Sequence, residues 1–367
     1  MNTVLAAVLN KAPGRLDLEK LVMDTPTPDE VRIDVAFAGL CHSDLHEIDG
    51  TFDTTAPIVL GHEAAGVVSA VGSNVRGLRV GDHVVTCLSA FCGWCASCMA
   101  GRLTLCTERG RLAQDRGRAR LVNDRGEPVR ATAGIGAFAE AVVVHQSSAV
   151  VIPDDVRLDT ASILGCAVTT GMGAVLRRAR VRVGDIVAVV GLGGIGIAAV
   201  QAARISGAAK VIGVDVVPEK LQRARAFGAT HIVNARDDDP VEAVRALTGG
   251  GVDHAFEAVG AGATVGQAFA MLAPGGTATV MGMVPDEHSI PLKGSDLFLF
   301  EKRLQGSFMG SNHFKTDIPA YLELYRQGRL QLDEMVTHRV PLEGINEGFA
   351  LMASGDAIRV VAEIGVN

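Results

Sequence analysis

Residues 191–196 carry the glycine-rich motif that most constrains the fold, Gly-Leu-Gly-Gly-Ile-Gly. An apolar segment precedes the motif and an apolar helical pattern follows it, so the glycines stand between a strand and a helix. Asp215 ends the next apolar segment, where dinucleotide-binding βαβ units place an acidic residue against a ribose hydroxyl. The glycines and the acid together predict a parallel α/β sheet that binds a dinucleotide.

This motif also predicts which dinucleotide is bound. The pyrophosphate is expected at the helix N-terminus, against Gly191, Gly193, Gly194, Ile195 and Gly196. The Asp215 carboxylate would accept from a ribose 2′-hydroxyl and repel a 2′-phosphate, and the two following valines offer no arginine to offset that repulsion. NAD is therefore favoured over NADP. A tight βα turn without a ligand would explain the glycines but not the acid.

Strand-like and helix-like segments alternate from about residue 159 to residue 308. Short apolar runs predict strands, and the amphipathic stretches between them predict helices. The predicted strands are Ile186–Val190, Lys210–Asp215, His231–Asn234, Val252–Glu257, Thr277–Met281 and Leu304–Phe308, and the helices are Ile195–Ser206, Pro218–Phe227, Pro240–Leu247 and Thr264–Leu272. Such alternation predicts an α/β fold with a doubly wound, parallel, six-stranded sheet.

The first 150 residues differ and predict a mostly β domain. Apolar residues alternate with polar or small ones between Val31 and Phe37, as in a half-buried strand, and further apolar runs lie at 64–71, 83–86 and 139–144. The tail after about Ser311 predicts two helices and a final strand, which is too short for a separate domain. We expect it to join the first domain, giving domains of 1–167 with 309–367 and of 168–308.

Six of the seven cysteines fall into two metal-ligand patterns. The first is a local cluster of Cys92, Cys95, Cys98 and Cys106. Four thiolates in one short segment can close a tetrahedron around zinc, which is typical of a structural site. Cys41, His62 and Cys166 form the second set, and three protein ligands leave one zinc position open for water or substrate. The sequence therefore predicts two zinc ions per chain, one structural and one catalytic.

Disulfides and an iron–sulfur cluster are the alternatives to zinc. Disulfides would leave one of the seven cysteines unpaired, and Met1–Leu9 lacks the basic segment and cleavage site of a signal peptide. The bacterial iron–sulfur pattern places its fourth cysteine after three residues and before a proline, whereas here Thr107 follows a longer spacing. Zinc is favoured, and Cys87, which fits neither set, is predicted to be a buried inert thiol.

Charge and hydropathy argue against two classes of partner. The net charge of −7 disfavours nucleic acid and anionic membranes. The longest apolar stretch, residues 186–200, is too short to span a bilayer. We expect a cytoplasmic protein with reduced thiols. The arginine-rich stretch Arg102–Arg130 is expected to be a solvated loop beside the cysteine cluster, with a rim for an anionic substrate as the alternative.

Two further motifs surround the candidate zinc ligands Cys41 and His62. Gly61-His62-Glu63 is followed by Gly66 and Gly72, and Gly39-Leu-Cys41-His42-Ser43-Asp44 precedes it. With the dinucleotide motif, the chain resembles the zinc-containing alcohol dehydrogenase family (medium-chain dehydrogenase/reductase) over essentially its whole length. The resemblance implies a GroES-like catalytic domain that carries the structural zinc lobe, and a Rossmann domain that binds NAD.

The resemblance also implies roles for single residues. Cys41, His62 and Cys166 would hold the catalytic zinc, and Glu63 would be a transient ligand or a structural residue. Ser43 and His46 resemble the family's proton relay, in which the serine hydroxyl takes the alcohol proton and the histidine passes it to solvent. Asp44 would orient His62, or alternatively cap a helix.

Further residues would contact the cofactor and the substrate. The resemblance places His42, Thr170, Lys220 and Arg359 at the cofactor. It places Phe52, Leu88, Phe138, Met283 and Met309 around the alcohol. Core packing explains each of these five apolar residues equally well.

These roles predict oxidation of a primary alcohol, medium-chain or aromatic, to the aldehyde with hydride transfer to NAD. Glutathione-dependent formaldehyde dehydrogenase activity stays open, because Arg109 and Arg111 flank Gly110, where that branch has an arginine, although Phe52 stands at its acidic position. A catalytically silent NAD-binding protein is a second alternative, which the intact zinc ligands argue against. The resemblance further implies a homo-oligomer, with a homodimer expected and a homotetramer left open.

Overall fold

The computed structural model describes residues 2–114 and 119–365 and separates the chain into two compact units. Unit 1 comprises Met1–Cys166, His313–Leu322 and Leu332–Asn367. Unit 2 comprises Ala167–Asn312 and Glu323–Gln331. Each unit buries hydrophobic side chains of its own: Ile33 and Phe138 are among those of unit 1, and Ile212 and Phe269 are among those of unit 2.

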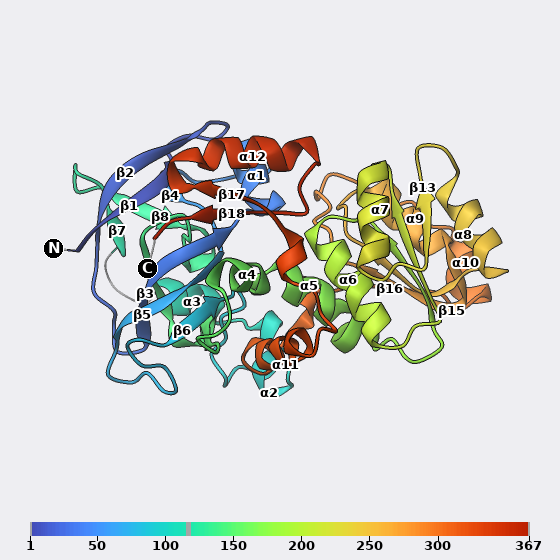
Figure 1. Ribbon diagram of the computed structural model, residues 1–367, viewed down its shortest axis with the longest axis horizontal. Coiled ribbons are helices and arrows are strands. Elements are labelled where there is room, and N and C mark those ends of the chain that lie inside the picture. The colour runs from blue at the N-terminus through green and yellow to red at the C-terminus, as the bar shows by residue number, and fades with distance from the viewer. Residues whose placement is uncertain (1, 115–118, 366–367) are drawn as a thin grey trace. The chain divides into compact units, whose positions relative to one another are not determined.

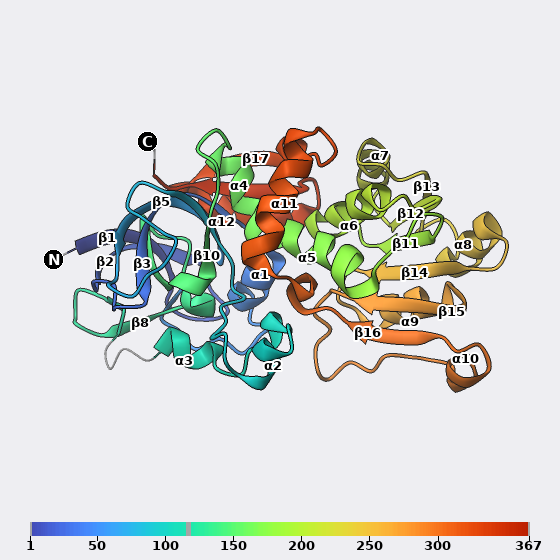
Figure 2. The same ribbon diagram turned by 90° about the horizontal axis from the view of Figure 1, so that it is seen from below.

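Unit 2 contains the predicted doubly wound sheet. All its neighbouring strands are parallel, in the order β13-β12-β11-β14-β15-β16. The strands are β11 (Ile186–Val190), β12 (Lys210–Asp215), β13 (His231–Asn234), β14 (Val252–Glu257), β15 (Leu272–Val280) and β16 (Arg303–Gly306). The order reverses between β11 and β14, and Figure 2 shows these strands beside one another. The predicted six-stranded Rossmann sheet is therefore confirmed.

Helices connect these strands (Figure 1). Each of them has buried side chains except the last, residues 294–299, in which no residue is buried. They are α6 (Gly194–Ile205), α7 (Pro218–Ala226), α8 (Pro240–Thr248), α9 (Gly262–Ala270) and α10 (Gly294–Leu299), and α5 (Ala167–Gly173) begins the unit. Local sequence explains their ends: α8 begins with a proline, its cap Asp239 accepts from two backbone amides, and Gly249 ends it with φ of 74°.

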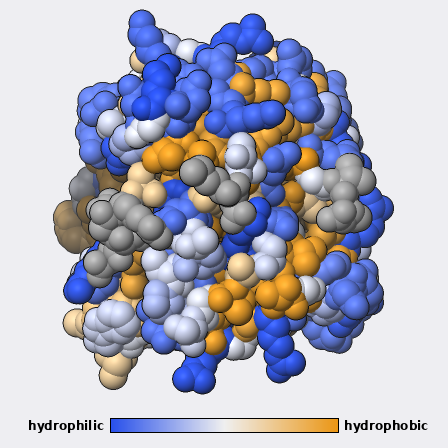
Figure 3. Space-filling view, turned by 90° about the vertical axis from the view of Figure 1, so that its left-hand side faces the viewer, coloured by the Kyte–Doolittle hydropathy of each residue, from blue (hydrophilic) through white to orange (hydrophobic). Residues whose placement is uncertain are grey.

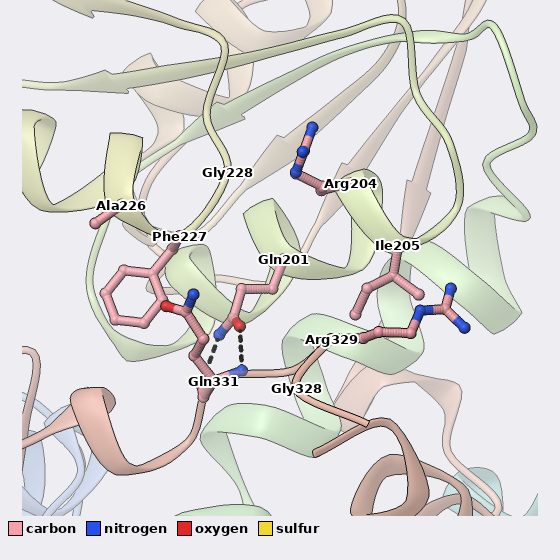
Figure 4. A pocket seen from close by; sticks show the side chains of 9 residues that line it. All are labelled: Gln201, Arg204, Ile205, Ala226, Phe227, Gly228, Gly328, Arg329 and Gln331. Carbon is pink, nitrogen blue, oxygen red and sulfur yellow. Dashed lines mark hydrogen bonds between the residues drawn. The ribbon is translucent and has the colours of Figure 1, made fainter. Parts of the chain in front are cut away.

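One segment differs from the predicted domain boundaries. Residues 323–331 belong to unit 2, whereas we expected the whole tail from 309 to 367 to join the first domain; residues 167 and 309–312, at the two boundaries, also belong to unit 2. For residues 323–331 the reason is a pair of hydrogen bonds from Gln201 on α6: its amide nitrogen donates to the carbonyl oxygen of Gln331 (3.0 Å), and its amide oxygen accepts from the Gln331 N–H (2.7 Å) (Figure 4). The surrounding pocket of about 430 Å³ lies at the C-terminal end of α6, the opposite end from the glycine motif.

Unit 1 is mostly β and is built from two sheets. One is a closed barrel in the order β1-β2-β7-β8-β4, and the other runs β10-β6-β5-β3-β18-β17 with β9 paired to β3. The barrel strands are β1 (Asn2–Leu9), β2 (Leu16–Met23), β4 (Ile58–Val59), β7 (Leu121–Val122) and β8 (Pro128–Ala131). The others are β3 (Glu30–Gly39), β5 (Glu63–Val71), β6 (His83–Thr86), β9 (Ala141–His145), β10 (Ala149–Val151), β17 (Val336–Pro341) and β18 (Arg359–Glu363).

The helices of unit 1 are short, apart from two that the tail supplies. They are α1 (His42–Ile48), α2 (Ala96–Met99), α3 (Arg109–Gln114), α4 (Leu158–Ser162) and α12 (Ile345–Ser354), and α11 (Phe314–Arg326) begins in this unit. The final strand β18 pairs with β3, so the tail joins the N-terminal sheet, as its predicted strand required.

The arginine-rich stretch corrects an expectation. We expected Arg102–Arg130 to be a solvated loop, but it contains α3, β7 and β8. Leu121 and Val129 are buried in the barrel core, and the guanidinium of Arg120 pairs with the buried carboxylate of Glu30. Buried apolar side chains on β7 and β8 therefore hold the described part of Arg102–Arg130 against the barrel. Residues 115–118 of this stretch lie outside the described residues.

The sequence predicted no segment that spans a bilayer, and the surface and the helices can be compared with that prediction. Figure 3 shows one face of the molecule, on which hydrophobic residues are interspersed among hydrophilic ones. No single described helix is long and apolar enough to cross a membrane. The broken pair Leu158–Gly165 and Ala167–Ala179 reaches the required length and composition only when both members are taken together.

Candidate active site

Four buried side chains of unit 1 converge on one point. Cys41 precedes α1, His62 and Glu63 stand at the start of β5, and Cys166 follows α4 and a short 3-10 turn. One ligand atom from each lies within 4.8 Å of the others. The four side chains come from segments far apart in sequence, and the sheet of unit 1 brings them together. Two thiols, an imidazole and a carboxylate form a donor set that suits zinc.

Hydrogen bonding around His62 fits a metal ligand. Nδ1 of His62 lies 3.3 Å from Oδ1 of Asp44, and Asp44 is fully buried. Nε2 is buried too, and no hydrogen-bond partner reaches it in the described part of the chain. A histidine that gives one ring nitrogen to a carboxylate and keeps the other free is the usual arrangement of a zinc ligand. The residues present therefore fit the ion.

Asp44 faces His62, as one of the two sequence alternatives requires, and it stabilises the start of α1 from the third helical position, whereas the N-cap itself is Cys41. Its carboxylate faces His62 and also accepts from the N–H of Gly61 (3.0 Å) and the N–H of Cys41 (3.2 Å). The Cys41 bond completes a capping box at the start of α1. One buried side chain thus ties together two of the candidate ligands and the first turn of the helix that follows.

The two thiols have opposite proton affinities. A hydrogen bond from Cys166, together with the nearby His62, holds the pKa of Cys41 well below its usual value despite burial. The same bond and burial raise the pKa of Cys166 well above its usual value. Burial tends to lower the pKa of His62, but Asp44 and Cys41 outweigh it and raise that pKa. Cysteine binds metals as the thiolate, and of the two sulfurs Cys41 is the one whose surroundings favour that form.

Glu63 pairs with Arg359 beside this cluster. The Arg359 guanidinium donates to Oε1 of Glu63, and both side chains are buried. Oε2 of Glu63 has no partner among the described residues. Burial and the neighbouring Cys41 raise the pKa of Glu63 to about 7, against the opposing charge of Arg359. Arg359 was predicted at the cofactor phosphates, and its observed partner is Glu63; a cofactor contact stays a prediction.

The local cysteine cluster forms the second candidate metal site. The sulfurs of Cys92, Cys95, Cys98 and Cys106 lie within 4.8 Å of one another. No disulfide joins any of the seven cysteines, all of which lie in the described part of the chain. The N–H groups of Trp94 and Cys95 point at the Cys92 sulfur at 3.4 and 3.3 Å, as expected around thiolates. Hydrogen bonds from the Cys98 and Thr107 backbone lower the pKa of Cys95 to about 5.

Helix α1 carries the predicted relay residues. Ser43 and His46 lie three residues apart on it, so their side chains share one side of the helix. The His46 ring contacts Phe52 edge-on with centroids 5.0 Å apart, and its Nδ1 lies 3.8 Å from Asp49. The His46 side chain is 35 % exposed, which gives it access to solvent. His42, the predicted phosphate contact, is exposed at the start of the same helix.

Unit 2 carries the glycine motif in the predicted strand-turn-helix context. Gly191 follows β11 with φ of 90°, which only glycine adopts readily. A Cβ at Gly196 would lie 1.8 Å from the Gly191 carbonyl oxygen, so this close packing also requires glycine. Around Gly193, the residue before α6, nothing lies within 4 Å of the Cβ position, which leaves room for a ligand at the helix N-terminus.

Asp215 holds the glycine motif in place through its carboxylate. Its Oδ2 accepts from the N–H of Leu192 at 2.8 Å, within the glycine motif. Its Oδ1 accepts from the N–H groups of Val216 and Val217. Each carboxylate oxygen has two lone pairs, so a ribose hydroxyl can still be accepted. Lys220 lies on the first turn of α7, which begins just after this point.

The remaining predicted residues occupy different surroundings. The Thr170 hydroxyl lies on α5, is buried, and contacts the Met309 sulfur at 3.6 Å. Phe138 is fully buried against Phe349, with ring centroids 5.8 Å apart, and is a core residue of unit 1. Leu88 packs at the edge of that core, and Met283 is 56 % exposed in unit 2. Their predicted contact with an alcohol stays a prediction.

Comparison with known proteins identifies the class to which these two sites belong. Residues 27–154 match the family described as alcohol dehydrogenase GroES-like domain, and residues 194–327 match zinc-binding dehydrogenase. An NDMA-dependent alcohol dehydrogenase from Amycolatopsis methanolica is 39% identical over 97% of this chain and 97% of its own. The chain belongs to the zinc-containing alcohol dehydrogenase family, and it is an oxidoreductase that oxidises alcohols.

Solved structures agree with the fold over the full length. An alcohol dehydrogenase zinc-binding domain protein from Burkholderia ambifaria is 36% identical with a TM-score of 0.95, and each chain covers 100% of the other. Benzyl alcohol dehydrogenase from Acinetobacter calcoaceticus is 30% identical with a TM-score of 0.92 at the same coverage. The predicted GroES-like and Rossmann architecture is thus confirmed.

Proposed function

We propose that the enzyme oxidises primary medium-chain or aromatic alcohols to aldehydes and transfers the hydride to NAD. The observation that carries the choice of NAD is the carboxylate of Asp215 at the end of β12, followed by two valines. An acid at this place accepts from a 2′-hydroxyl and repels a 2′-phosphate. The backbone amides of Gly193 and Gly194 start α6, where they can bind the pyrophosphate.

We infer that the cluster of Cys41, His62 and Cys166 holds the catalytic zinc, and that the four-cysteine cluster holds the second ion. A zinc ion bound at the first set supplies Lewis acidity to a hydroxyl group of the substrate. Asp44 fixes the ring of His62 for this task. Ser43 would take the alcohol proton, and His46, which reaches solvent, would release it. The products are aldehyde, NADH and a proton.

The preference for an apolar substrate rests on two arguments. Benzyl alcohol dehydrogenase is among the similar structures, which supports an aromatic alcohol. The second argument concerns Arg109 and Arg111, the two arginines that kept the glutathione alternative open. The Arg109 guanidinium donates to the carbonyl oxygens of Ala90 and Thr104 at 3.1 and 2.6 Å. The side chain of Arg111 is 70 % exposed near Glu108. Arg109 therefore binds the backbone just before and within the four-cysteine cluster, at Ala90 and Thr104.

The test is a set of specificity constants measured side by side. Ethanol, hexanol, benzyl alcohol and formaldehyde with glutathione are assayed with NAD and with NADP. Because the similar Amycolatopsis protein is named NDMA-dependent, each assay is run with and without NDMA. Hexanol or benzyl alcohol with NAD is expected to exceed ethanol, because each buried methylene contributes about 0.8 kcal/mol, roughly fourfold in specificity. A large advantage of the glutathione adduct, or of NADP, would contradict the proposal.

We further propose that the enzyme is a cytoplasmic homodimer that pairs through unit 2. β16 is an edge strand of its sheet, and the neighbouring residues 297–300 expose Leu297, Phe298, Leu299 and Phe300 by 45 to 73 %. Exposed apolar side chains beside an open strand edge favour pairing with a second copy. Light scattering of Phe298→Asp against wild type tests the proposed dimer: a shift to monomer supports this dimer face.

The cytoplasmic location is supported by the cysteines. All seven are free of disulfides, which fits a reducing compartment.

A further inference from the structure

Glu257 is a buried carboxylate that the proposed chemistry does not use. It ends β14 and is fully buried. Its Oε1 accepts from the N–H of Val259 (2.9 Å), the N–H of Gly260 (2.8 Å) and the hydroxyl of Thr264 (2.7 Å). Its Oε2 is buried without a hydrogen-bond partner in the described part of the chain. Burying a carboxylate oxygen without a donor is costly, so a specific task for this side chain is expected.

Its position in the sheet suggests that task. Glu257 pairs in register with Val190, the last residue of β11, and Gly191 of the glycine motif comes next. The strand order reverses between β11 and β14. Open α/β sheets bind their ligands at the carboxyl ends of the strands at such a reversal. Glu257 therefore lies at the edge of the proposed dinucleotide site, on the strand that pairs with β11 beside the motif.

The turn that Glu257 holds lies directly on the glycine motif. The N–H of Ala258 donates to the Val190 carbonyl oxygen at 2.8 Å. A Cβ at Gly191 would lie 2.7 Å from Cγ2 of Val259 and 3.1 Å from the carbonyl carbon of Ala258. The three donors to Oε1 come from residues 259, 260 and 264, so this single oxygen fixes the turn and ties it to the start of α9.

We propose that Glu257 is a positioning residue for the dinucleotide: it holds residues 258–260 as the wall opposite Gly191, and this wall sets the affinity for the cofactor. The inference rests on the proposed function, because it takes the glycine motif as the cofactor site. Since all three donors go to Oε1, a neutral acceptor of the same shape can replace the carboxylate. Glu257→Gln keeps that acceptor, and Glu257→Leu removes it.

The test uses the zinc-loaded protein and measures three quantities for each variant: the Kd of NADH by fluorescence titration, the KM of NAD with kcat at saturating NAD, and the melting temperature. Glu257→Leu is expected to raise both the NADH Kd and the NAD KM at least tenfold and to leave kcat within about threefold. Glu257→Gln is expected to match wild type within about 1.5-fold in all constants.

Asp253 on the same strand provides a matched control. Its Oδ2 accepts from the N–H of Ile186 at 2.8 Å, so it also anchors a backbone amide, but at the amino end of the sheet. Asp253→Leu is expected to lower the melting temperature with the NADH Kd unchanged. If Glu257→Leu behaves in the same way, with only the melting temperature affected, Glu257 is merely structural and the inference is wrong.

A second variant decides the matter if Glu257→Leu does not fold. Thr264→Val keeps the side-chain shape and removes one of the three donors, so the NADH Kd should rise about threefold; an unchanged Kd would overturn the inference. Wild type gives a separate check. A wild-type protein that binds neither NADH nor NADPH contradicts the proposed function itself. Wild-type binding that persists unchanged in Glu257→Leu contradicts only the role of Glu257.

Discussion

Oδ1 of Asp44 lies 3.3 Å from Nδ1 of His62, and both side chains are buried. The same carboxylate holds the backbone N–H groups of Cys41 and Gly61. Asp44 thus controls both the ring orientation of one candidate zinc ligand and the backbone that carries another. Carboxylates that hold a ligating histidine commonly change metal affinity by 10- to 100-fold when they are removed.

Asp44→Ala should therefore weaken zinc binding by about 10- to 100-fold and lower activity in step. Competition with a chromogenic chelator measures the affinity of the weaker site. Asp239→Ala is the matched control, because Asp239 also caps a helix through two backbone amides but lies far from any cysteine in sequence. The control should lose about 1 kcal/mol of stability and no zinc. Zinc affinity that is equal in both variants would show that Asp44 only caps α1.

The two cysteine sets should fail in different ways. Cys95→Ala breaks a set of four local ligands whose metal binding contributes to folding, so a large fall in melting temperature is expected. Cys166→Ala removes one ligand from the set that includes His62 and Glu63, so the protein should stay folded and lose turnover. Calorimetry, activity and elemental analysis check this, with two zinc ions per chain expected in wild type. Equal losses of stability in both variants would contradict the division into structural and catalytic sites.

The sequence predicted most of unit 2 because its pattern is local. Strand β11 and strand β12 end where their apolar runs end, and α8 begins at the predicted proline. The set of Cys92, Cys95, Cys98 and Cys106 could also be predicted, because its spacing is local. The set of Cys41, His62 and Cys166 was predicted from the types and number of its ligands and from the family resemblance, since these residues are far apart in sequence. The strands β1 and β2 were not predicted, because residues 4–9 of β1 are all apolar and lack the alternation that indicates a half-buried strand.

Contacts between distant segments could not be predicted from the sequence. Arg359 lies at the end of the chain, and nothing in its local pattern indicates that it pairs with buried Glu63. Gln201 and Gln331 are equally separated, and their bonds draw residues 323–331 into unit 2. The sequence predicts Glu257 only as the end of a strand, although an acid that ends an apolar strand three residues before Gly260 is a signal for a functional side chain.

Asp215 should determine the choice of cofactor, and it should also affect stability. Asp215→Gly removes the ribose acceptor, its charge and the bond to the Leu192 N–H together. We expect the KM of NAD to rise at least tenfold and the NADP to NAD specificity ratio to increase, with a lower melting temperature. Asp215→Asn separates these effects, because its amide oxygen can still accept from backbone donors while the charge is gone. Unchanged NAD preference in both variants would show that Asp215 serves only the fold.

His46 should matter for turnover more than for cofactor binding. Its ring reaches solvent from α1, three residues beyond Ser43, so His46→Ala removes the outer end of the proposed relay. We expect alcohol oxidation to slow about tenfold or more, and added imidazole to restore part of the rate, because general acid–base catalysis contributes at least this much. NADH affinity, measured by fluorescence titration, should stay within twofold. A full rate without imidazole would mean that His46 is a surface residue packed on Phe52.

The Glu30–Arg120 pair should make stability depend on pH. Burial alone would raise the pKa of Glu30, but the charge of Arg120 and the donors of Thr27 outweigh it and hold that pKa below its usual value of 4.5. A carboxyl with a lowered folded-state pKa contributes stability above its unfolded pKa, and this contribution is lost as the pH falls through the folded value. Glu30→Gln should therefore cost about 3 kcal/mol at pH 7, because it leaves the largely buried Arg120 without its counter-ion.

Urea unfolding of Glu30→Gln and wild type from pH 7 down to pH 3 measures this difference directly. The gap between the two should be constant above about pH 5 and should shrink below pH 4.5, as wild-type Glu30 takes up its proton. Glu127→Gln is the control, since the Glu127 and Arg125 side chains are 56 and 69 % exposed and exposed pairs contribute little. That control should show no measurable change at any pH. A gap for Glu30→Gln that stays constant down to pH 3 would mean that packing, and not the charge pair, accounts for the loss.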